Sequence, residues 1–241
     1  MSAAIAPAEL AEVRRSRRHP RPTQFDYLHV RRLVADLRHA LVGLDGEIHD
    51  ILDVYCGSRP YDDLLPAGAR CTSLDVVGNP YGVADVVTNE FLPFSDASFD
   101  LVTCFEAFHY VENPQDGIGE LRRVLRPGGA VVVSVPFVWE YDRTILEHRY
   151  TGPELADLFR GWERVRVVEN GGRAIAWATL TGSLLAQARD RLPRAVRGAF
   201  APVFLALNGC GAVLDRAERR SSGDVTLPMN LLLTARRPHD G

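Results

Sequence analysis

The sequence predicts an α/β fold with a largely parallel sheet, and three observations support this prediction. Between residues 48 and 137, short apolar runs typical of strands alternate with turn residues and helical segments, as they do in βαβ units. Two further strand-like runs towards the C-terminus bring the expected number of strands to seven. The chain has 241 residues, of which 46% are hydrophobic and 24% are charged, so it is long enough to bury one sizeable core.

The first half of the chain predicts a helix followed by alternating strands. Residues 26–42 place leucine and valine at helical spacing and predict an amphipathic helix, whereas residues 1–22 are expected to form a loose arm. Strands are expected in the runs IHDILDV, CTSLDVV, FDLVTCF and AVVVSVPF. The helix predicted at residues 115–125 ends in RPGG, because Pro127 cannot continue a helix and the glycines supply a left-handed exit into the next strand.

The second half contains an irregular loop, two strands and a long helical stretch. Residues 137–150 show no regular period and are interpreted as an active-site loop, which leads into a helix with an N-cap at Thr151 and a capping-box acid at Glu154. ERVRVVEN and DVTLPMNLLLTAR predict the sixth and seventh strands. The predicted units are an N-terminal arm and helix, a ligand-binding core, a helical insertion and the last strand of the core, at residues 1–44, 45–171, 172–222 and 223–241.

The charges are unevenly distributed along a chain whose formal net charge is −3 and whose 28 basic residues are all arginine. Residues 1–44 carry a net charge of +4, residues 45–159 one of −13, and residues 160–241 one of +6. So small a total does not indicate a nucleic acid or membrane partner. Two uncharged stretches, residues 174–188 and 198–214, are shorter than a bilayer-spanning helix needs. With no signal peptide at the start, we expect a cytoplasmic protein without a transmembrane segment.

Acidic residues at the ends of two predicted strands indicate a nucleoside ligand. Asp53 ends an apolar strand and precedes a turn of small residues at positions 56–58, which lets backbone N–H groups approach a ligand closely. Asp75 follows about 20 residues later at the tip of the next strand. At this position doubly wound sheets place a carboxylate that accepts hydrogen bonds from both ribose hydroxyls. NAD and FAD are disfavoured because Tyr55 and Pro60 stand where the G-x-G-x-x-G cradle has glycine.

Four motifs make the chain similar to a known family. ILDVYCGSRPY, SLDVVGNPYGVADVV, FLPFSDASFDLVTCFEAFHYVENP and ELRRVLRPGGAVVVSVPF occur in this order. In sequence and spacing they resemble the class I S-adenosylmethionine-dependent methyltransferases, and within them a broad bacterial group, over residues 48–170. Together with the pattern of elements, the resemblance implies a Rossmann-like doubly wound sheet of seven strands, with an N-terminal helix and a helical insertion between strands six and seven, and S-adenosylmethionine as cofactor.

The resemblance also implies which residues hold the cofactor. These are Asp53, Tyr55, Cys56, Gly57 and Ser58 for the methionine part, Asp75 for the ribose, Val76, Thr88 and Asn89 for adenine, and Cys104 and Phe105 for the methionine amino group and the methyl-transfer site. The chain departs from the family pattern at Tyr55, where glycine is preferred, and at Thr88 with Asn89, which replaces the usual aspartate near adenine N6. These departures bear on affinity more than on the identity of the ligand.

Methyl transfer to a hydroxyl requires a general base, and histidine suits a pH near neutrality. Of the seven histidines, His109 follows the fourth strand at the family's Glu or His position, and His148 lies in the irregular loop; either could instead have a structural role. The residues predicted to bind substrate are Tyr110, Tyr141, Asp142, Glu147, Arg149 and Tyr150. Polar and aromatic side chains of this kind suit a hydroxyl-rich ligand such as a sugar, although the loop could also be a lid that only excludes water.

The sequence therefore predicts an O-methyltransferase of a hydroxylated small molecule, preferably a sugar or saccharide intermediate. A polyketide or phenolic acceptor and a binding protein of this fold without turnover are alternatives, and a nicotinamide-dependent oxidoreductase is a more distant one. A Mg²⁺ ion is compatible with the acids of the loop but is not indicated by their spacing, and the four cysteines lack the paired spacing of a zinc site. The helical insertion could cap the substrate, touch a lipid surface or join two subunits; we expect a homodimer and no nucleic acid partner.

Overall fold

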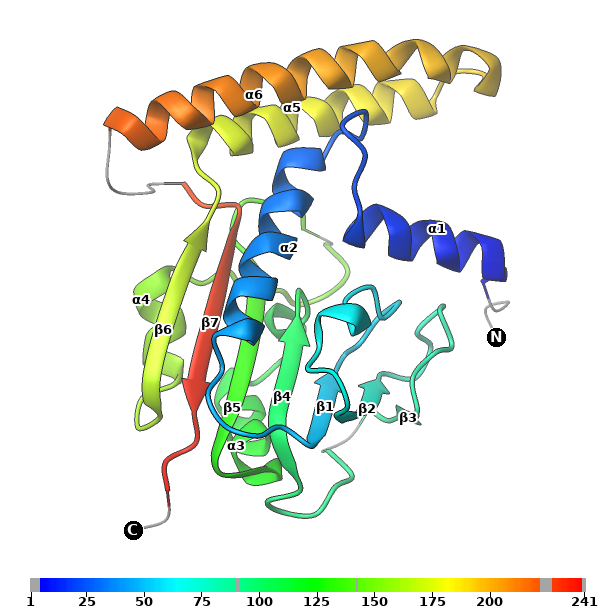
Figure 1. Ribbon diagram of the computed structural model, residues 1–241. Coiled ribbons are helices and arrows are strands. Elements are labelled where there is room, and N and C mark those ends of the chain that lie inside the picture. The colour runs from blue at the N-terminus through cyan, green and yellow to red at the C-terminus, as the bar shows by residue number, and fades with distance from the viewer. Residues whose placement is uncertain (1–4, 90–91, 142, 222–226, 240–241) are drawn as a thin grey trace.

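The computed structural model describes residues 5–89, 92–141, 143–221 and 227–239, which fold around one seven-stranded sheet (Figure 1). The strand order is β3-β2-β1-β4-β5-β7-β6, and only β7 runs antiparallel to its neighbours, β5 and β6. The strands are β1 (Asp50–Val54), β2 (Arg70–Asp75), β3 (Val86–Val87), β4 (Phe99–Phe105), β5 (Leu125–Pro136), β6 (Glu163–Asn170) and β7 (Asn230–Arg236). The predicted fold class is confirmed.

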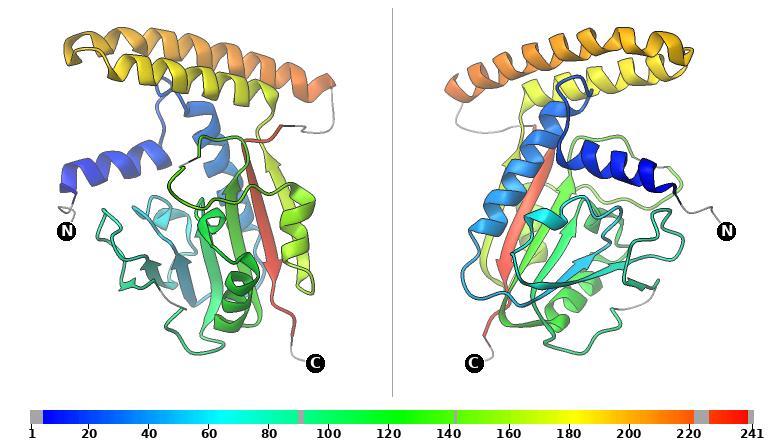
Figure 2. Two further views of the ribbon diagram at one scale, coloured as in Figure 1. Left: turned by 180° about the vertical axis from the view of Figure 1, so that it is seen from behind. Right: turned by 45° about the vertical axis from the view of Figure 1, so that its right-hand side comes forward.

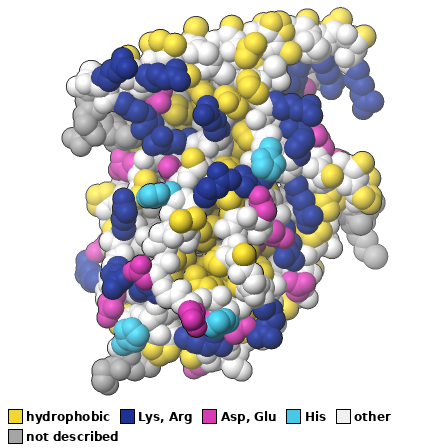
Figure 3. All heavy atoms as spheres, in the orientation of Figure 1, with side chains coloured by type: hydrophobic (Ala, Val, Ile, Leu, Met, Phe, Trp, Pro, Cys, Tyr) yellow, Lys and Arg dark blue, Asp and Glu magenta, His cyan; other side chains and the backbone are white. Residues whose placement is uncertain are grey.

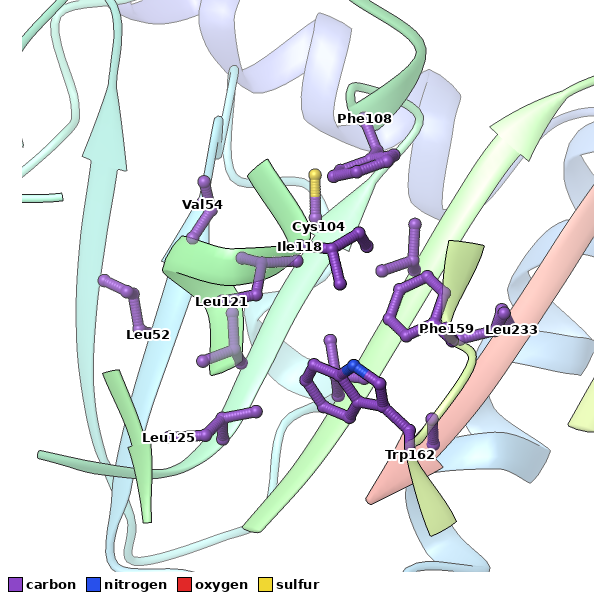
Figure 4. Close-up of a cluster of buried hydrophobic side chains, with 14 of the residues drawn as sticks. Leu52, Val54, Cys104, Phe108, Ile118, Leu121, Leu125, Phe159, Trp162 and Leu233 are labelled. Atoms are coloured by element: carbon purple, nitrogen blue, oxygen red, sulfur yellow. The ribbon is translucent and has the colours of Figure 1, made fainter. Parts of the chain in front are cut away.

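Helices cover both faces of the sheet and form a separate layer beyond one end of it (Figures 1 and 2). They are α1 (Pro7–Arg18), α2 (Tyr27–Val42), α3 (Pro114–Val124), α4 (Gly152–Leu158), α5 (Arg173–Asp190) and α6 (Ala201–Ser221). On one face, α3 and α4 bury apolar side chains against the strands, among them Ile118, Leu121 and Leu155; Figure 4 shows the first two in one cluster with Phe159. On the other face, α2 buries Leu33, Leu37 and Leu41, whose spacing of four places them on one side of the helix.

The connections in the first half of the sheet differ from the expected βαβ pattern. Of the described residues between β1 and β4, only Asp62–Leu64 form a helical turn. The reason is local, because the segments after β1 and β2 contain several prolines and glycines, which oppose helix formation. The predicted RPGG exit also differs in detail: Gly128 has the left-handed φ of 77°, but β5 already begins at Leu125, so the turn lies inside the strand.

Residues 7–18 form helix α1, so the expectation of a loose arm over residues 1–22 was wrong for this part of it. The helix is fastened to the loop after β1 by two arginines. Arg14 Nε donates to the carbonyl oxygen of Ser58 at 2.5 Å, and Arg18 binds both carboxylate oxygens of Asp63 at 2.7 and 2.8 Å. These partners lie 44 and 45 residues away in the sequence, so local pattern could not reveal them.

The predicted helical insertion is confirmed as a hairpin of α5 and α6, which lies across the end of α2 (Figure 1). Close packing depends on small residues: a Cβ at Gly211 would lie 2.8 Å from both Ala178 Cβ and Leu28 Cδ1. The buried Asn208 side chain donates from Nδ2 to the carbonyl oxygens of Pro22 and Gln24, at 2.8 and 2.7 Å. The hairpin therefore holds the turn that connects α1 with α2.

Among the described residues, one helical stretch, Arg194–Ser221, is long and apolar enough to cross a membrane by length and composition. Most of it is exposed, and it contains one of the two uncharged stretches noted in the sequence. In this fold α6 packs side by side with α5 (Figures 1 and 2), and Phe204, Asn208 and Gly211 of α6 are buried. The stretch thus forms one half of a helical hairpin.

Candidate functional site

A cavity of about 460 Å³ opens at the carboxyl ends of β1, β2 and β4. In this strand order the connections reverse direction between β1 and β4, and such a switch point leaves a crevice for ligands. The cavity is lined by Arg17, Asp53, Tyr55, Cys56, Gly57, Pro60, Tyr61, Asp75, Val76, Asn79, Phe105, Glu106, Ala107, Tyr110 and Ile145. Most of the predicted cofactor residues therefore converge, and α1 contributes Arg17 from outside the sheet.

Asp53 is a buried carboxyl group on the cavity wall. Its Oδ1 accepts a hydrogen bond from Thr103 Oγ1 at 2.7 Å. Burial raises the pKa of Asp53 to about 7, with the Thr103 hydrogen bond opposing the shift and the neighbouring Asp62 and Asp75 reinforcing it. A positively charged group in the cavity would favour the ionised carboxylate, so Asp53 fits a cationic ligand.

Asp75 ties the tip of β2 to the loop after β1. Its Oδ2 accepts from the Gly57 N–H at 2.7 Å and from Asn79 Nδ2 at 2.6 Å, and its Oδ1 accepts from the Val76 N–H at 2.8 Å. Gly57 has a φ of +56°, and a Cβ there would meet no atom within 4 Å. The loop is thus held with exposed backbone close to a carboxylate, as binding a ribose and its neighbouring groups requires.

Tyr55, the departure from the family's glycine, adopts the left-handed φ of +56° that a glycine would adopt easily. Its side chain forms part of the wall of the first cavity and of a second one of about 470 Å³. The second cavity also contains Asn89 and Cys104 in its wall. Asn89 Oδ1 already accepts from the Val77 N–H at 2.9 Å. The predicted cofactor residues are thus divided between two adjoining cavities that share Tyr55.

Two of the predicted cofactor residues do not line either cavity. Ser58 is fully buried, and its carbonyl oxygen accepts from Arg14. Thr88 donates its backbone N–H to the Asp75 carbonyl oxygen at 3.0 Å. The positions of both residues support the loops that carry Gly57 and Asp75.

Glu106 is a site residue that the sequence analysis missed. It follows β4 directly, has a left-handed φ of +54°, and lines the cavity together with Arg17. Its Oε2 accepts from Asn230 Nδ2, whereas its Oε1 is buried and has no hydrogen-bond partner among the described residues. Burial raises the pKa of Glu106 to about 7 against the hydrogen bonds from Ser134 and Asn230. The acid directly after a predicted strand, in TCFEAF, was the available signal.

The two predicted catalytic histidines do not line this cavity. His109 is buried, and its ring lies 3.9 Å from that of Tyr110, between centroids. Burial, reinforced by the positive charge of Arg149, lowers the pKa of His109 to about 4, so the ring is neutral and weakly basic near pH 7. His148 stacks on Tyr150 at 5.8 Å between centroids and lies with it in a separate surface depression.

Of the predicted substrate-binding residues that the structure describes, Tyr110 alone lines the first cavity. Glu147 and Arg149 form an ion pair at 2.6 Å, Tyr150 is buried, and Tyr141 is 64% exposed. Asp142 lies outside the described residues. The loop nevertheless reaches the cavity through Ile145, an apolar residue that the sequence analysis did not single out.

The residues that the structure describes contain no cluster of three or more His, Cys, Asp or Glu side chains placed to hold a metal ion. All four cysteines are free, and burial raises the pKa of the Cys56 and Cys104 thiols that line the two cavities. Both thiols are therefore neutral at physiological pH.

Comparison with known proteins relates the chain to methyltransferases. Residues 52–133 match the model of a family described as a methyltransferase domain. A 24-methylenesterol C-methyltransferase 2 from rice, Oryza sativa subsp. japonica, is 34% identical over 54% of this chain and 38% of its own length. The ubiquinone biosynthesis O-methyltransferase of Dechloromonas aromatica is 30% identical over 35% of this chain and 43% of its own. The chain thus spans about two-fifths of each of these relatives.

The demethylmenaquinone methyltransferase of Corynebacterium glutamicum is matched over more of its length, with 28% identity over 56% of this chain and 73% of its own. Among solved structures, the [4+2]-cyclase SpnF has a TM-score of 0.55 and 21% identity, covering 89% of this chain and 83% of its own. Phosphoethanolamine N-methyltransferase 2 of Haemonchus contortus, in complex with S-adenosyl-L-methionine, has a TM-score of 0.54 and 12% identity over 93% and 59%. At these identities the two structures support the fold alone.

Proposed function

We propose that the chain is a class I S-adenosylmethionine-dependent methyltransferase that acts as an O-methyltransferase of a hydroxylated small molecule, on the basis of its match to a methyltransferase domain and its methyltransferase relatives. The observation that carries the proposal is the convergence of three carboxyl groups, Asp53, Asp75 and Glu106, on one cavity. We assign Asp53 and Asp75 to the cofactor and Glu106 to the acceptor. When bound, S-adenosylmethionine supplies an electrophilic methyl group on a sulfonium.

The cavity residues fit this cofactor chemically. Asp53 is suited to the ammonium group, because a cation would relieve the cost of ionising a buried carboxyl. Asp75 is suited to ribose hydroxyls, and Val76, 40% exposed at the cavity, to one face of adenine. Arg17, brought in by α1, places a cationic side chain in the cavity wall and can pair with the cofactor carboxylate.

We assign the general base to Glu106. An acceptor hydroxyl must lose its proton as the new O–C bond forms, and Glu106 lines the cavity with one carboxylate oxygen that has no hydrogen-bond partner among the described residues. A pKa of about 7 matches the working pH, which favours efficient proton transfer. The sequence predicts His109 as the general base. Its pKa of about 4 and its position outside the cavity wall make Glu106 the better candidate.

The cavity wall favours an acceptor with an apolar or aromatic body. Tyr61, Phe105, Tyr110 and Ile145 contribute rings and an aliphatic side chain, whereas most of the polar loop residues predicted to bind a sugar lie elsewhere. We therefore place a phenolic or similar acceptor ahead of a saccharide. The names of the relatives, which specify sterol, ubiquinone and demethylmenaquinone methylation, agree with an apolar acceptor.

Calorimetric titration with S-adenosylmethionine, followed by labelled-methyl transfer to saccharide, phenolic and lipid acceptors with and without magnesium and a chelator, tests the proposal. We expect binding, loss of most of the affinity in Asp75→Ala, and label in a phenolic or lipid product at oxygen. Label on a carbon atom of the product would indicate C-methylation, the reaction that the name of the rice relative specifies, in place of O-methylation. Binding without transfer to any acceptor would instead support a binding protein, and no binding at millimolar cofactor would overturn the proposal.

A further inference from the structure

The outer face of the α5–α6 hairpin is a broad apolar surface. On α5, Trp177, Leu180 and Leu184 follow one another at spacings of three and four and are 47%, 38% and 68% exposed. On α6, Val203 and Val213 are 44% and 63% exposed. Figure 3 shows hydrophobic side chains along the upper edge of the molecule, over this hairpin. Exposed apolar patches of this kind mark surfaces that bind a partner.

Arginines stand at both ends of this apolar surface. Residues 173–221 contain eight arginines and three acids, a net charge of +5. Each acid takes part in an ion pair, in Arg173–Glu218, Arg189–Asp190 and Arg219–Asp215. Exposed arginines that form no ion pair among the described residues lie at the turn of the hairpin and at the end of α6. They are Arg191, Arg194, Arg216 and Arg220.

We propose that the α5–α6 hairpin docks on an anionic lipid bilayer, with its apolar side chains in the headgroup region and its terminal arginines on lipid phosphates. Apolar area and basic charge together are what interfacial helices require. Trp177, exposed on the same face, is of the residue type that favours the membrane–water interface. A second copy of the chain fits less well, because two hairpins each carrying +5 would face one another across that interface.

The hairpin lies on the membrane and does not cross it. Asn208 and Gly211 of α6 are buried where the hairpin meets α2: Asn208 is hydrogen-bonded to the turn before α2, and a Cβ at Gly211 would lie 2.8 Å from Leu28 Cδ1. Withdrawing α6 into a bilayer would break these contacts and leave the carbonyl groups of that turn unpaired, which is costly. Docking is independent of the proposed methyl transfer, so each can fail without the other.

Sedimentation of the full chain with vesicles tests the proposal, using phosphatidylcholine alone and phosphatidylcholine mixed with phosphatidylglycerol. We expect binding to the mixed vesicles only, with release by high salt. Combining Trp177→Ser, Leu184→Gln and Val213→Gln should weaken binding at least about tenfold. Combining Arg194→Gln and Arg220→Gln should weaken it roughly fivefold for each arginine.

Matched controls come from surfaces far from the hairpin. Val42→Gln replaces a 79% exposed valine, and Arg160→Gln replaces an arginine whose side chain is 81% exposed; both should bind vesicles like the wild type. Circular dichroism melts should show that every variant remains folded. Wild-type protein left in the supernatant with both vesicle types would overturn docking, as would a dimer that the apolar variant dissociates. Retention after an alkaline carbonate wash would overturn it in favour of a membrane-spanning helix.

Discussion

The cavity at the sheet edge and the α5–α6 hairpin are built in opposite ways. The cavity is acidic, and its key groups are held by short hydrogen bonds between neighbouring strands and the loop after β1: the Gly57 N–H donates to Asp75, and Thr103 Oγ1 donates to Asp53. The hairpin is basic and apolar and is held by close packing of small residues such as Gly211. The cavity depends on particular residues at particular positions, whereas the packing of the hairpin, apart from the hydrogen bonds of Asn208, depends on the size and polarity of its side chains.

Two hydrogen-bonded contacts connect these regions. Asn208 of α6 holds the turn that follows α1, the helix that brings Arg17 to the cavity. On the other side, Glu140 Oε1 accepts from Ser183 Oγ at 2.6 Å and from Gln187 Nε2 at 3.1 Å of α5. The loop that contains Glu140 also supplies Ile145 to the cavity wall. A change in the hairpin should therefore affect the cavity, but less than a change in the cavity itself.

The largest effect is expected from Glu106→Gln. The amide keeps the shape and an oxygen that can accept from Asn230, but it cannot take a proton. We expect kcat to fall about 10²- to 10⁴-fold, the range typical of a lost general base, with little change in the Kd for S-adenosylmethionine. Single-turnover transfer of labelled methyl, with calorimetry for the cofactor, measures the two quantities separately.

A matched comparison is His109→Gln, which alters the histidine favoured by the sequence. If Glu106 is the base, this variant keeps most of its turnover, and the wild-type rate rises with pH through a pKa near 7 that the Glu106→Gln variant lacks. A large loss of kcat in His109→Gln together with normal turnover in Glu106→Gln would reverse the assignment.

Asn208→Leu tests the connection between the two regions. Leucine fills a similar volume but leaves the carbonyl oxygens of Pro22 and Gln24 unpaired, so the free energy of unfolding should fall by about 1–3 kcal/mol. Because the turn positions α1 and Arg17, the affinity for the cofactor should also fall a few-fold. Urea unfolding and calorimetry measure the two effects.

Gly209→Ala is the control on the same helix, since a Cβ there would meet no atom within 4 Å. It should leave the affinity unchanged. Should Asn208→Leu weaken stability but not cofactor binding, the hairpin and the cavity would be energetically independent.

Cofactor binding should depend on pH through Asp53. Its pKa of about 7, raised by burial, means that the free protein holds a proton there at lower pH, and a cationic ligand must displace it. Between pH 8 and pH 6 the Kd should therefore rise about tenfold. Titration calorimetry in buffers of different ionisation enthalpy would also detect the released proton.

The raised pKa of Asp53 has the opposite effect on the stability of the free protein, which falls as the pH rises. Because the folded pKa of Asp53 lies above its unfolded value, its contribution to stability is fully present below about pH 4 and is lost as the pH rises through about 7. Asp53→Asn should flatten both the stability profile and the binding profile in this range. A pH-independent Kd in the wild type would contradict a role for Asp53 in cofactor binding.

The parts of the molecule that could be predicted from sequence are those encoded within short segments. Asp53, Asp75 and Gly57 belong to motifs in which spacing and residue type suffice, and the alternation of strands indicated the sheet. Arg17 and Glu106 could not be predicted as site residues from short segments. The position of Arg17 depends on hydrogen bonds and an ion pair that join α1 to residues more than 40 positions away. The position of the Glu106 side chain depends on a hydrogen bond from Asn230, near the far end of the chain. His109 follows the correct strand, but the short helical turn that contains it buries its ring.

The smallest effect is expected from Thr151→Ala at the start of α4, a feature predicted from the sequence and remote from both regions. Thr151 Oγ1 accepts from the Glu154 N–H, and Glu154 Oε2 accepts from the Thr151 N–H at 2.8 Å, forming the capping box. Loss of the hydroxyl should cost about 1 kcal/mol, a fall in Tm of roughly 2–4 °C for a chain of this size. Cofactor affinity and vesicle binding should not change. A change in cofactor affinity or in vesicle binding would mean that the cap of α4 is energetically coupled to the cavity or to the hairpin, and the two regions could then not be treated as separate.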